Sequence, residues 1–191
     1  AGLTATIEPR SEQRVILTGG DDERDQQLTA GTEVTYGAAA ALTIDLPEVA
    51  RITVRSGASE PAQLQALVQF AVDTYGRLDI LMNNAWSGTS SSVTEMSLDD
   101  WQRDLDVSLT AIFVACKHAI PEMIKAGGGS IINIASIHGL VVRTRNAAYS
   151  TVKAGMLHLT RQMAVDYGPH NIRVNAICPG GTILPENEER Y

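Results

Sequence analysis

The sequence predicts an α/β protein, with a doubly wound parallel sheet and helices on both faces. Short apolar runs with strand character alternate with longer segments of helical spacing, which is the order expected when helices connect parallel strands. The chain has 191 residues, of which 44% are apolar, and this is enough for the core of one domain. We therefore expect residues 1–191 to form a single domain.

The strands expected in the first third of the chain are short. The first strand is expected at Arg14–Leu17, running into the turn Thr18–Gly19–Gly20. A second is expected at Ala39–Ile44, ending at Asp45, and a third at Ile52–Val54. Between the second and third strands there is room for barely one helical turn.

Later elements carry clearer start and stop signals. Ser59 can cap a helix that Gly76 ends, and Ser97 with Asp100 is a capping pattern for a long helix through Ile124. The other expected elements are, in order, strands at Leu78–Met82 and Ile131–Ala135, a helix at 146–167 and a strand at Ile172–Ile177.

Charge and cysteine content restrict the classes of partner. The net charge of −7 argues against nucleic acid or an anionic membrane surface, since both require a basic face. No stretch approaches the length of a membrane span and no signal pattern opens the chain, so we expect a cytoplasmic protein. Cys116 and Cys178 lack close spacing, which is typical of reduced thiols, and we expect no metal site.

The most informative side chains are Tyr149 and Lys153, four residues apart on an expected helix, with Ser136 thirteen positions upstream. Residues at this spacing share one face of a helix. A neighbouring cation lowers the pKa of a phenol by about 1–3 units, so Tyr149 could exchange a proton at neutral pH. The Ser136 hydroxyl could then hold an alcohol or carbonyl oxygen. The same spacing also arises by chance on surface helices, so the pair alone is only a candidate site.

Four polar or glycine-containing segments follow the ends of expected strands. Ligands bind parallel α/β sheets at the carboxyl ends of the strands, where the strand order reverses. These residue types are also common in ordinary turns, but their joint position favours one binding cleft. The segments are Thr18–Gly19–Gly20, Asn83–Asn84–Ala85, Ser136 and Pro179–Gly180.

From Ser59 to Thr182 the chain resembles the short-chain dehydrogenase/reductase family, because four blocks occur in the family's order. The resemblance implies a Rossmann-like fold. It also implies an NAD(P)-dependent oxidoreductase that interconverts a secondary alcohol and a ketone by hydride transfer. The blocks are Gly76–Ala85, the strand before Ser136, the Tyr149 and Lys153 pair, and Arg173–Gly180.

The family resemblance implies a role for each of these residues. Tyr149 would be the general acid or base, Lys153 would lower its pKa and hold the nicotinamide ribose, and Ser136 would orient the reacting oxygen. Ser108 takes the place of an Asn that helps to hold a proton-relay water in the family. Cofactor contacts would come from Thr18, Gly19, Gly20, Asp45, Asn83, Asn84, Ala85, Lys153, Pro179, Gly180 and Thr182.

Asp45 favours NAD over NADP. A carboxylate at the end of the second strand can accept hydrogen bonds from the ribose hydroxyls of NAD, and it would repel the 2′-phosphate of NADP. An alternative role is a helix cap, since Asp45 precedes Leu46–Pro47–Glu48.

The sequence also departs from the family's pattern. Glu23 and Asp25 fall where the family has spaced glycines near the cofactor pyrophosphate, and these acids would repel it. Gly57 replaces an acid that contacts the adenine, and Trp86 replaces a glycine beside the cofactor cleft. A catalytically silent relative that acts as a scaffold or partner subunit is therefore the alternative function.

The resemblance has two further implications. Helices at 101–124 and 146–167 would form an interface between subunits, so a homodimer or homotetramer is expected. The family's substrate-covering helices would follow Thr182, and a full helix would lie between Asp45 and Val54. We expect either a divergent protein or a sequence from which these segments are missing.

Overall fold

The computed structural model describes residues 3–9, 13–17, 24–28, 32–36, 44–46, 51–54 and 61–181, with side chains from residue 62 onward. The expectations for Thr18, Gly19, Gly20, Gly57, Ser59 and Thr182 concern positions outside the described residues, so they stay predictions.

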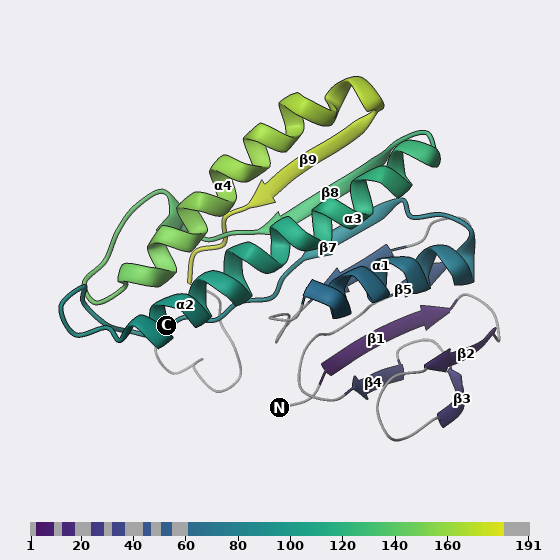
Figure 1. Cartoon of the computed structure of the whole chain (residues 1–191), viewed down its shortest axis with the longest axis horizontal. Coiled ribbons are helices and arrows are strands. Elements are labelled where there is room, and N and C mark those ends of the chain that lie inside the picture. Colours follow the sequence, from purple (N-terminus) through teal and green to yellow (C-terminus); the bar gives the residue numbers. More distant parts are fainter. Residues whose placement is uncertain are drawn as a thin grey trace.

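A parallel sheet forms the centre of the described structure (Figure 1). Its strands follow the order β6-β7-β8-β9, and every neighbouring pair is parallel. The four strands predicted after residue 51 are confirmed, with ends shifted by up to two residues. Their bounds are β6 (Arg51–Val54), β7 (Ile80–Asn83), β8 (Gly129–Ile134) and β9 (Ile172–Ile177).

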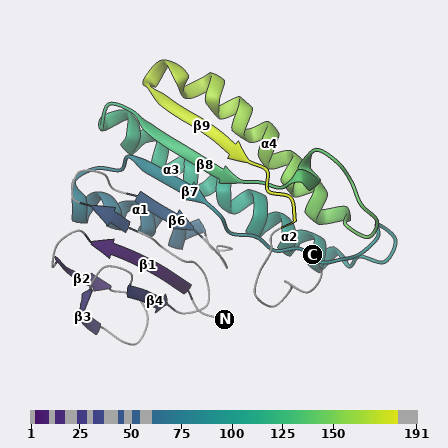
Figure 2. The same cartoon turned by 180° about the vertical axis from the view of Figure 1, so that it is seen from behind.

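Helices connect the strands of this sheet in sequence. Helix α1 (Pro61–Tyr75) joins β6 to β7, and α4 (Ala147–Tyr167) joins β8 to β9. Each connection moves one strand further in the same direction, so right-handed crossovers place all of the helices on one face. Figures 1 and 2 show this face and the opposite one. The α/β class with a helix-flanked parallel sheet is confirmed, although in the described residues the helices lie on one side.

The connection between β7 and β8 is a continuous helical segment. It consists of α2 (Leu98–Leu105), a π-helical turn η2 (Asp106–Thr110) and α3 (Ala111–Lys125). The predicted cap is confirmed, because the Ser97 side chain accepts a hydrogen bond of 3.0 Å from the Asp100 amide. Two glycines with positive φ, Gly127 at 89° and Gly128 at 140°, end the segment.

The segment Leu98–Lys125 is long and apolar enough to cross a membrane by length and composition alone. The expectation that no stretch approaches this length was therefore wrong. Half of its most apolar window is buried inside the fold, which is the situation of a core helix. Its buried apolar residues in α3 are Ala111, Ile112, Val114, Ala115, Cys116, Ala119, Ile120 and Met123.

The core lies between the helices and the covered face of the sheet. Alternate strand residues, such as Leu81 and Ile131, point into it because side chains along a strand alternate between faces. Burying each large apolar side chain contributes roughly 1.5–3 kcal/mol before entropy is counted. The largest fully buried side chains are Leu64, Leu78, Leu81, Ile112, Met123, Ile131, Met156 and Ile172.

The amino-terminal strands do not join this sheet. The strand predicted at Arg14–Leu17 exists as β2 (Gln13–Leu17), but its predicted parallel pairing is wrong, because it pairs antiparallel with β3 (Arg24–Leu28). Only residues 18–23 separate the two strands. A crossover between parallel strands needs about a dozen or more residues, whereas an antiparallel return needs far fewer.

Asp45 lies inside a strand of a separate three-stranded sheet. It is the middle residue of β5 (Ile44–Leu46), which pairs parallel with β1 (Leu3–Pro9) and places Asp45 opposite Glu8. The strand continues one residue past the predicted end at Asp45, and residues 39–43 of the predicted strand lie outside the described residues. The third strand of this sheet is β4 (Thr32–Tyr36), which pairs antiparallel with β1.

The expected homo-oligomer stays a prediction. Phe113 on α3 is 52% exposed and Val165 on α4 is 75% exposed, so both helices carry apolar side chains at the surface. Exposed apolar side chains of this kind are available for a contact between subunits, and they lie on the two helices that the family resemblance assigns to that interface.

Candidate active site

The structure places Ser136 at the carboxyl edge of the parallel sheet. Ser136 follows β8 and caps the short helix η3 (Ile137–Gly139), with 6% of its surface exposed. The Ile137 amide donates a hydrogen bond of 3.0 Å to the Pro179 carbonyl. The segments containing Ser136 and Pro179–Gly180 therefore meet at one edge, as the sequence predicted.

Lys153 and Tyr149 lie together near the start of α4. The Lys153 ammonium is 5.7 Å from the centre of the Tyr149 ring, so the two residues share a face of the helix. Lys153 is 3% exposed and donates a hydrogen bond of 2.7 Å to the Ile134 carbonyl, the last residue of β8. This bond connects the helix that carries Tyr149 to the strand that leads to Ser136.

Burial changes the acidity of Lys153. The loss of hydration disfavours its charged form and lowers its pKa to about 8, and the nearby Cys178 opposes this effect only in part. The ammonium is thus a buried cation beside Tyr149. It can stabilise negative charge on the Tyr149 oxygen during proton transfer.

Gly139 allows η3 to pack directly on α4. A Cβ at this position would lie 2.8 Å from the Lys153 carbonyl oxygen and 2.9 Å from a Leu157 methyl carbon. The close approach holds the Ser136 segment against the helix that carries the Tyr149 and Lys153 pair.

We expect the Gly139→Ala substitution to destabilise the fold. The added methyl must push η3 away from the α4 backbone, and overpacking of this kind costs about 1–3 kcal/mol. Gly168→Ala is a matched control, since a Cβ there meets no described atom within 4 Å and φ is −54°. Chemical denaturation should show a loss of stability in the first variant only. Equal stability of the two variants would contradict this packing argument.

The Ser108 hydroxyl is engaged with the loop after β7. It accepts a hydrogen bond of 2.7 Å from the Ser87 amide and donates one of 2.9 Å to the Ser87 carbonyl. Ser108 is completely buried within the π-helical turn. Its side chain therefore holds the loop that contains Trp86, and its proposed relay role stays a prediction.

Asp104 holds the same loop and was not singled out from the sequence. Its carboxylate is completely buried and accepts hydrogen bonds of 2.7 Å from the Ser87 hydroxyl and from the Thr89 amide. The sequence feature that could have identified Asp104 is its spacing from Ser108, because residues four apart share a helix face.

Two aromatic rings flank the Tyr149 phenol. The Trp86 ring lies 5.9 Å from it at 85°, and the His138 ring lies 6.3 Å from it at 71°, both in edge geometry. Nδ1 of His138 is buried and has no hydrogen-bond partner among the described residues. The sequence identified Trp86 and His138 singly, but their convergence on Tyr149 depends on the fold.

The loop that carries Trp86 also contacts the first residue of α4 and the residues just before it. The Ala147 amide donates a hydrogen bond of 3.3 Å to the Ser91 carbonyl, and the Arg145 guanidinium lies 2.7 Å from a Glu95 carboxylate oxygen. Hydrogen bonds from Ser92 and then from Arg145 lower the pKa of Glu95 to about 2. These contacts keep the loop beside Tyr149.

The predicted cofactor residues after β7 have different environments. The Asn83 side chain points into the core and donates a hydrogen bond of 2.8 Å to Asn133, which in turn donates to Thr160. Asn84 is half-buried and Ala85 is buried. The side chain of Asn83 thus joins β7, β8 and α4, and any cofactor contact from it would come from the backbone.

Most of the chain matches proteins of one known family. Residues 27–190 match the short chain dehydrogenase family. The chain is 48% identical over 120 residues to trans-4-hydroxycyclohexanecarboxylate dehydrogenase from Sinomonas cyclohexanicum, covering 63% of this chain and 46% of that protein. It is 39% identical over 138 residues to glucose 1-dehydrogenase 2 from Bacillus subtilis, covering 71% of this chain and 53% of the relative.

A solved dehydrogenase structure is also similar to this chain. The ligand-free structure of aldohexose dehydrogenase from Thermoplasma acidophilum aligns with a TM-score of 0.66 at 30% identity, covering 78% of this chain and 60% of that structure. The chain spans about half the length of the curated relatives it matches.

Proposed function

Because the chain belongs to the short-chain dehydrogenase family, we propose that the protein is an NAD(P)-dependent oxidoreductase. It would interconvert a small secondary alcohol and the corresponding ketone. The observation that carries this proposal is the buried Lys153 ammonium beside the Tyr149 ring, hydrogen-bonded to the strand that leads to Ser136.

The hydrogen bonds at Ser136 leave its hydroxyl proton available. Its oxygen accepts a bond of 3.1 Å from the His138 amide, so the O–H can donate to the reacting oxygen of the substrate. Tyr149 would give its proton to that oxygen during ketone reduction and take it back during alcohol oxidation. Lys153 would stabilise the phenolate through its charge.

The described residues fit the nicotinamide end of the cofactor. Lys153 supplies donors suited to ribose hydroxyls. Among the described residues, nothing would lie within 4 Å of a Cβ at Gly180, so they leave room beside its backbone. The bound cofactor would supply or accept the hydride. Asp45 would favour NAD at the adenosine end, and this preference stays a prediction.

A steady-state comparison of NAD and NADP with a panel of secondary alcohols tests the proposal. We expect absorbance of the reduced nicotinamide to appear with both alcohol and cofactor present. We expect kcat/KM to be at least about tenfold higher with NAD, because one repulsive contact of about 1.4 kcal/mol has that effect. A clear preference for NADP would refute the role of Asp45 and leave the enzyme class intact.

One observation favours the catalytically silent alternative. β2 pairs antiparallel with β3, so the predicted first strand does not lead into a helix whose amino terminus could face a pyrophosphate. Titrating NADH and following its fluorescence separates the two functions. If NADH does not bind, the result would support the scaffold or partner-subunit alternative and refute the proposed enzymatic function.

A further inference from the structure

Trp86 presents an unusually exposed aromatic surface beside the residue proposed to transfer the proton. The side chain is 58% exposed, and its ring meets the Tyr149 ring edge at a centroid distance of 5.9 Å. Large aromatic side chains are favourable to bury, so an exposed indole fixed at a site is a candidate ligand contact.

The loop that follows this indole is held in place. Ser87 is hydrogen-bonded through its backbone to Ser108 and through its hydroxyl to the buried Asp104 carboxylate. The Thr89 amide also donates to Asp104. A side chain on a loop held by several partly buried hydrogen bonds loses little further freedom when a ligand binds, which favours recognition.

Gly88 sets the distance between the two rings. A Cβ at this position would lie 2.9 Å from Cδ2 of Tyr149 and 3.2 Å from Cζ3 of Trp86. Any larger residue would therefore push the rings apart. The absence of a side chain here lets the indole and the phenol pack against the same short stretch of backbone.

His138 gives the phenol a second aromatic neighbour. Its ring lies 6.3 Å from the Tyr149 ring at 71°, and its residue directly follows Ile137, which is 40% exposed. The ring of Tyr149 therefore contacts one aromatic ring from the β7–α2 loop and one from η3.

From this arrangement we propose that Trp86 is a specificity-determining wall that makes the enzyme prefer ring-shaped secondary alcohols over open-chain ones. This inference rests on the proposed function. A rigid, flat indole surface can contact the whole face of an alicyclic or aromatic ring at once. An open-chain alcohol covers less of that surface and must give up internal rotations to do so.

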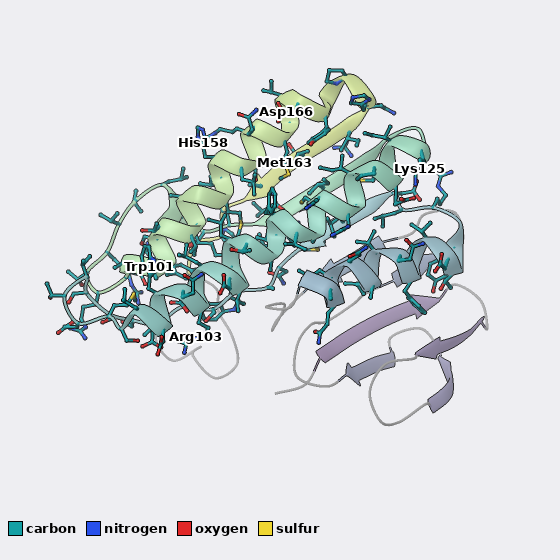
Figure 3. The ribbon with its side chains drawn as sticks, viewed as in Figure 1. Trp101, Arg103, Lys125, His158, Met163 and Asp166 are labelled. Carbon is teal, nitrogen blue, oxygen red and sulfur yellow. The ribbon has the colours of Figure 1, made fainter. Side chains whose placement is uncertain are left out.

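The test compares cyclohexanol with 2-butanol as substrates of the wild type, Trp86→Ala, Trp86→Phe and Trp101→Phe. Trp101 lies on α2 and is the matched control for loss of an indole (Figure 3). We expect Trp86→Ala to lower kcat/KM for cyclohexanol about tenfold or more and for 2-butanol by less than about threefold. Trp86→Phe should retain most of the preference, and Trp101→Phe should retain all of it.

A second readout is independent of turnover. In the Trp101→Phe variant Trp86 is the remaining tryptophan of the sequence, so its fluorescence reports on the pocket. Cyclohexanol added with NADH should change this emission in a saturable way, and 2-butanol should change it much less.

The outcomes separate this inference from the proposed function. If Trp86→Ala lowers kcat/KM equally for both alcohols, the indole positions Tyr149. If kcat/KM is unchanged for both alcohols, the indole has no role in specificity. Either result overturns the inference while the proposed function stands. If the wild type oxidises neither alcohol nor any member of the wider panel, the proposed function fails and this inference fails with it.

Discussion

The Tyr149→Phe variant is expected to lose turnover by about 10²–10⁴-fold, the usual contribution of a general acid or base. The substitution removes only the phenolic oxygen. The ring that packs against Trp86 and His138 remains, so the fold and the shape of the site should be preserved. Steady-state alcohol oxidation measures the effect, and thermal unfolding checks that the variant is folded.

Tyr167→Phe is the matched control for this experiment. Tyr167 is the last residue of the same helix, whereas Tyr149 is the third, so the two positions lie at opposite ends of α4. The control should keep full activity. Full activity of Tyr149→Phe would refute the assignment of the proton-transfer residue and, with it, the proposed mechanism.

The Lys153→Met variant is expected to lose activity by about 10²-fold or more, because the site would lose the charge proposed to stabilise the phenolate. The same variant should change how stability depends on pH. Lys153 is 3% exposed and its pKa is lowered from 10.5 to about 8, so the folded protein loses this proton before the unfolded chain does.

The sign of the pH effect follows from this order of proton loss. Between about pH 8 and pH 10.5 the unfolded state binds more protons than the folded state, so the free energy of unfolding contributed by Lys153 rises with pH. Below about pH 8 the cost of burying the ammonium is fully present. The difference between these two pKa values corresponds to roughly 3 kcal/mol.

Denaturation curves of the wild type and Lys153→Met, measured from neutral to alkaline pH, isolate this contribution by subtraction. Lys125→Met is the control, since Lys125 is a 71% exposed residue paired with Glu122 at the opposite end of the long helix from Trp101 and Arg103 (Figure 3). We expect the control to follow the wild type at every pH. A pH-independent difference between wild type and Lys153→Met would contradict the buried-cation interpretation.

Local signals in the sequence were sufficient for the elements from β6 to β9. Helix caps such as Ser97, stops such as Gly76 and the apolar strand at Ile172–Ile177 act over a few residues, so their effects do not depend on the rest of the chain. The same is true of the Tyr149 and Lys153 pair, because the period of the helix alone places both on one face.

Strand pairing in the amino-terminal third could not be predicted in this way. The segment Gln13–Leu17 has strand character in either arrangement, and its partner, Arg24–Leu28, was not recognised as a strand. Pairing depends on which backbone edges are available and on the length of the connection, and these are properties of the folded chain.

By itself, the sequence determined an alternating α/β chain with a phenol, an ammonium and a hydroxyl in the order of the short-chain dehydrogenases. Only the tertiary structure decided which side chains surround that phenol. Trp86, His138 and Asp104 reach the site or its supporting loop through contacts between elements distant in sequence. Such contacts depend on how α4, η3 and the β7–α2 loop pack together, which no local spacing specifies.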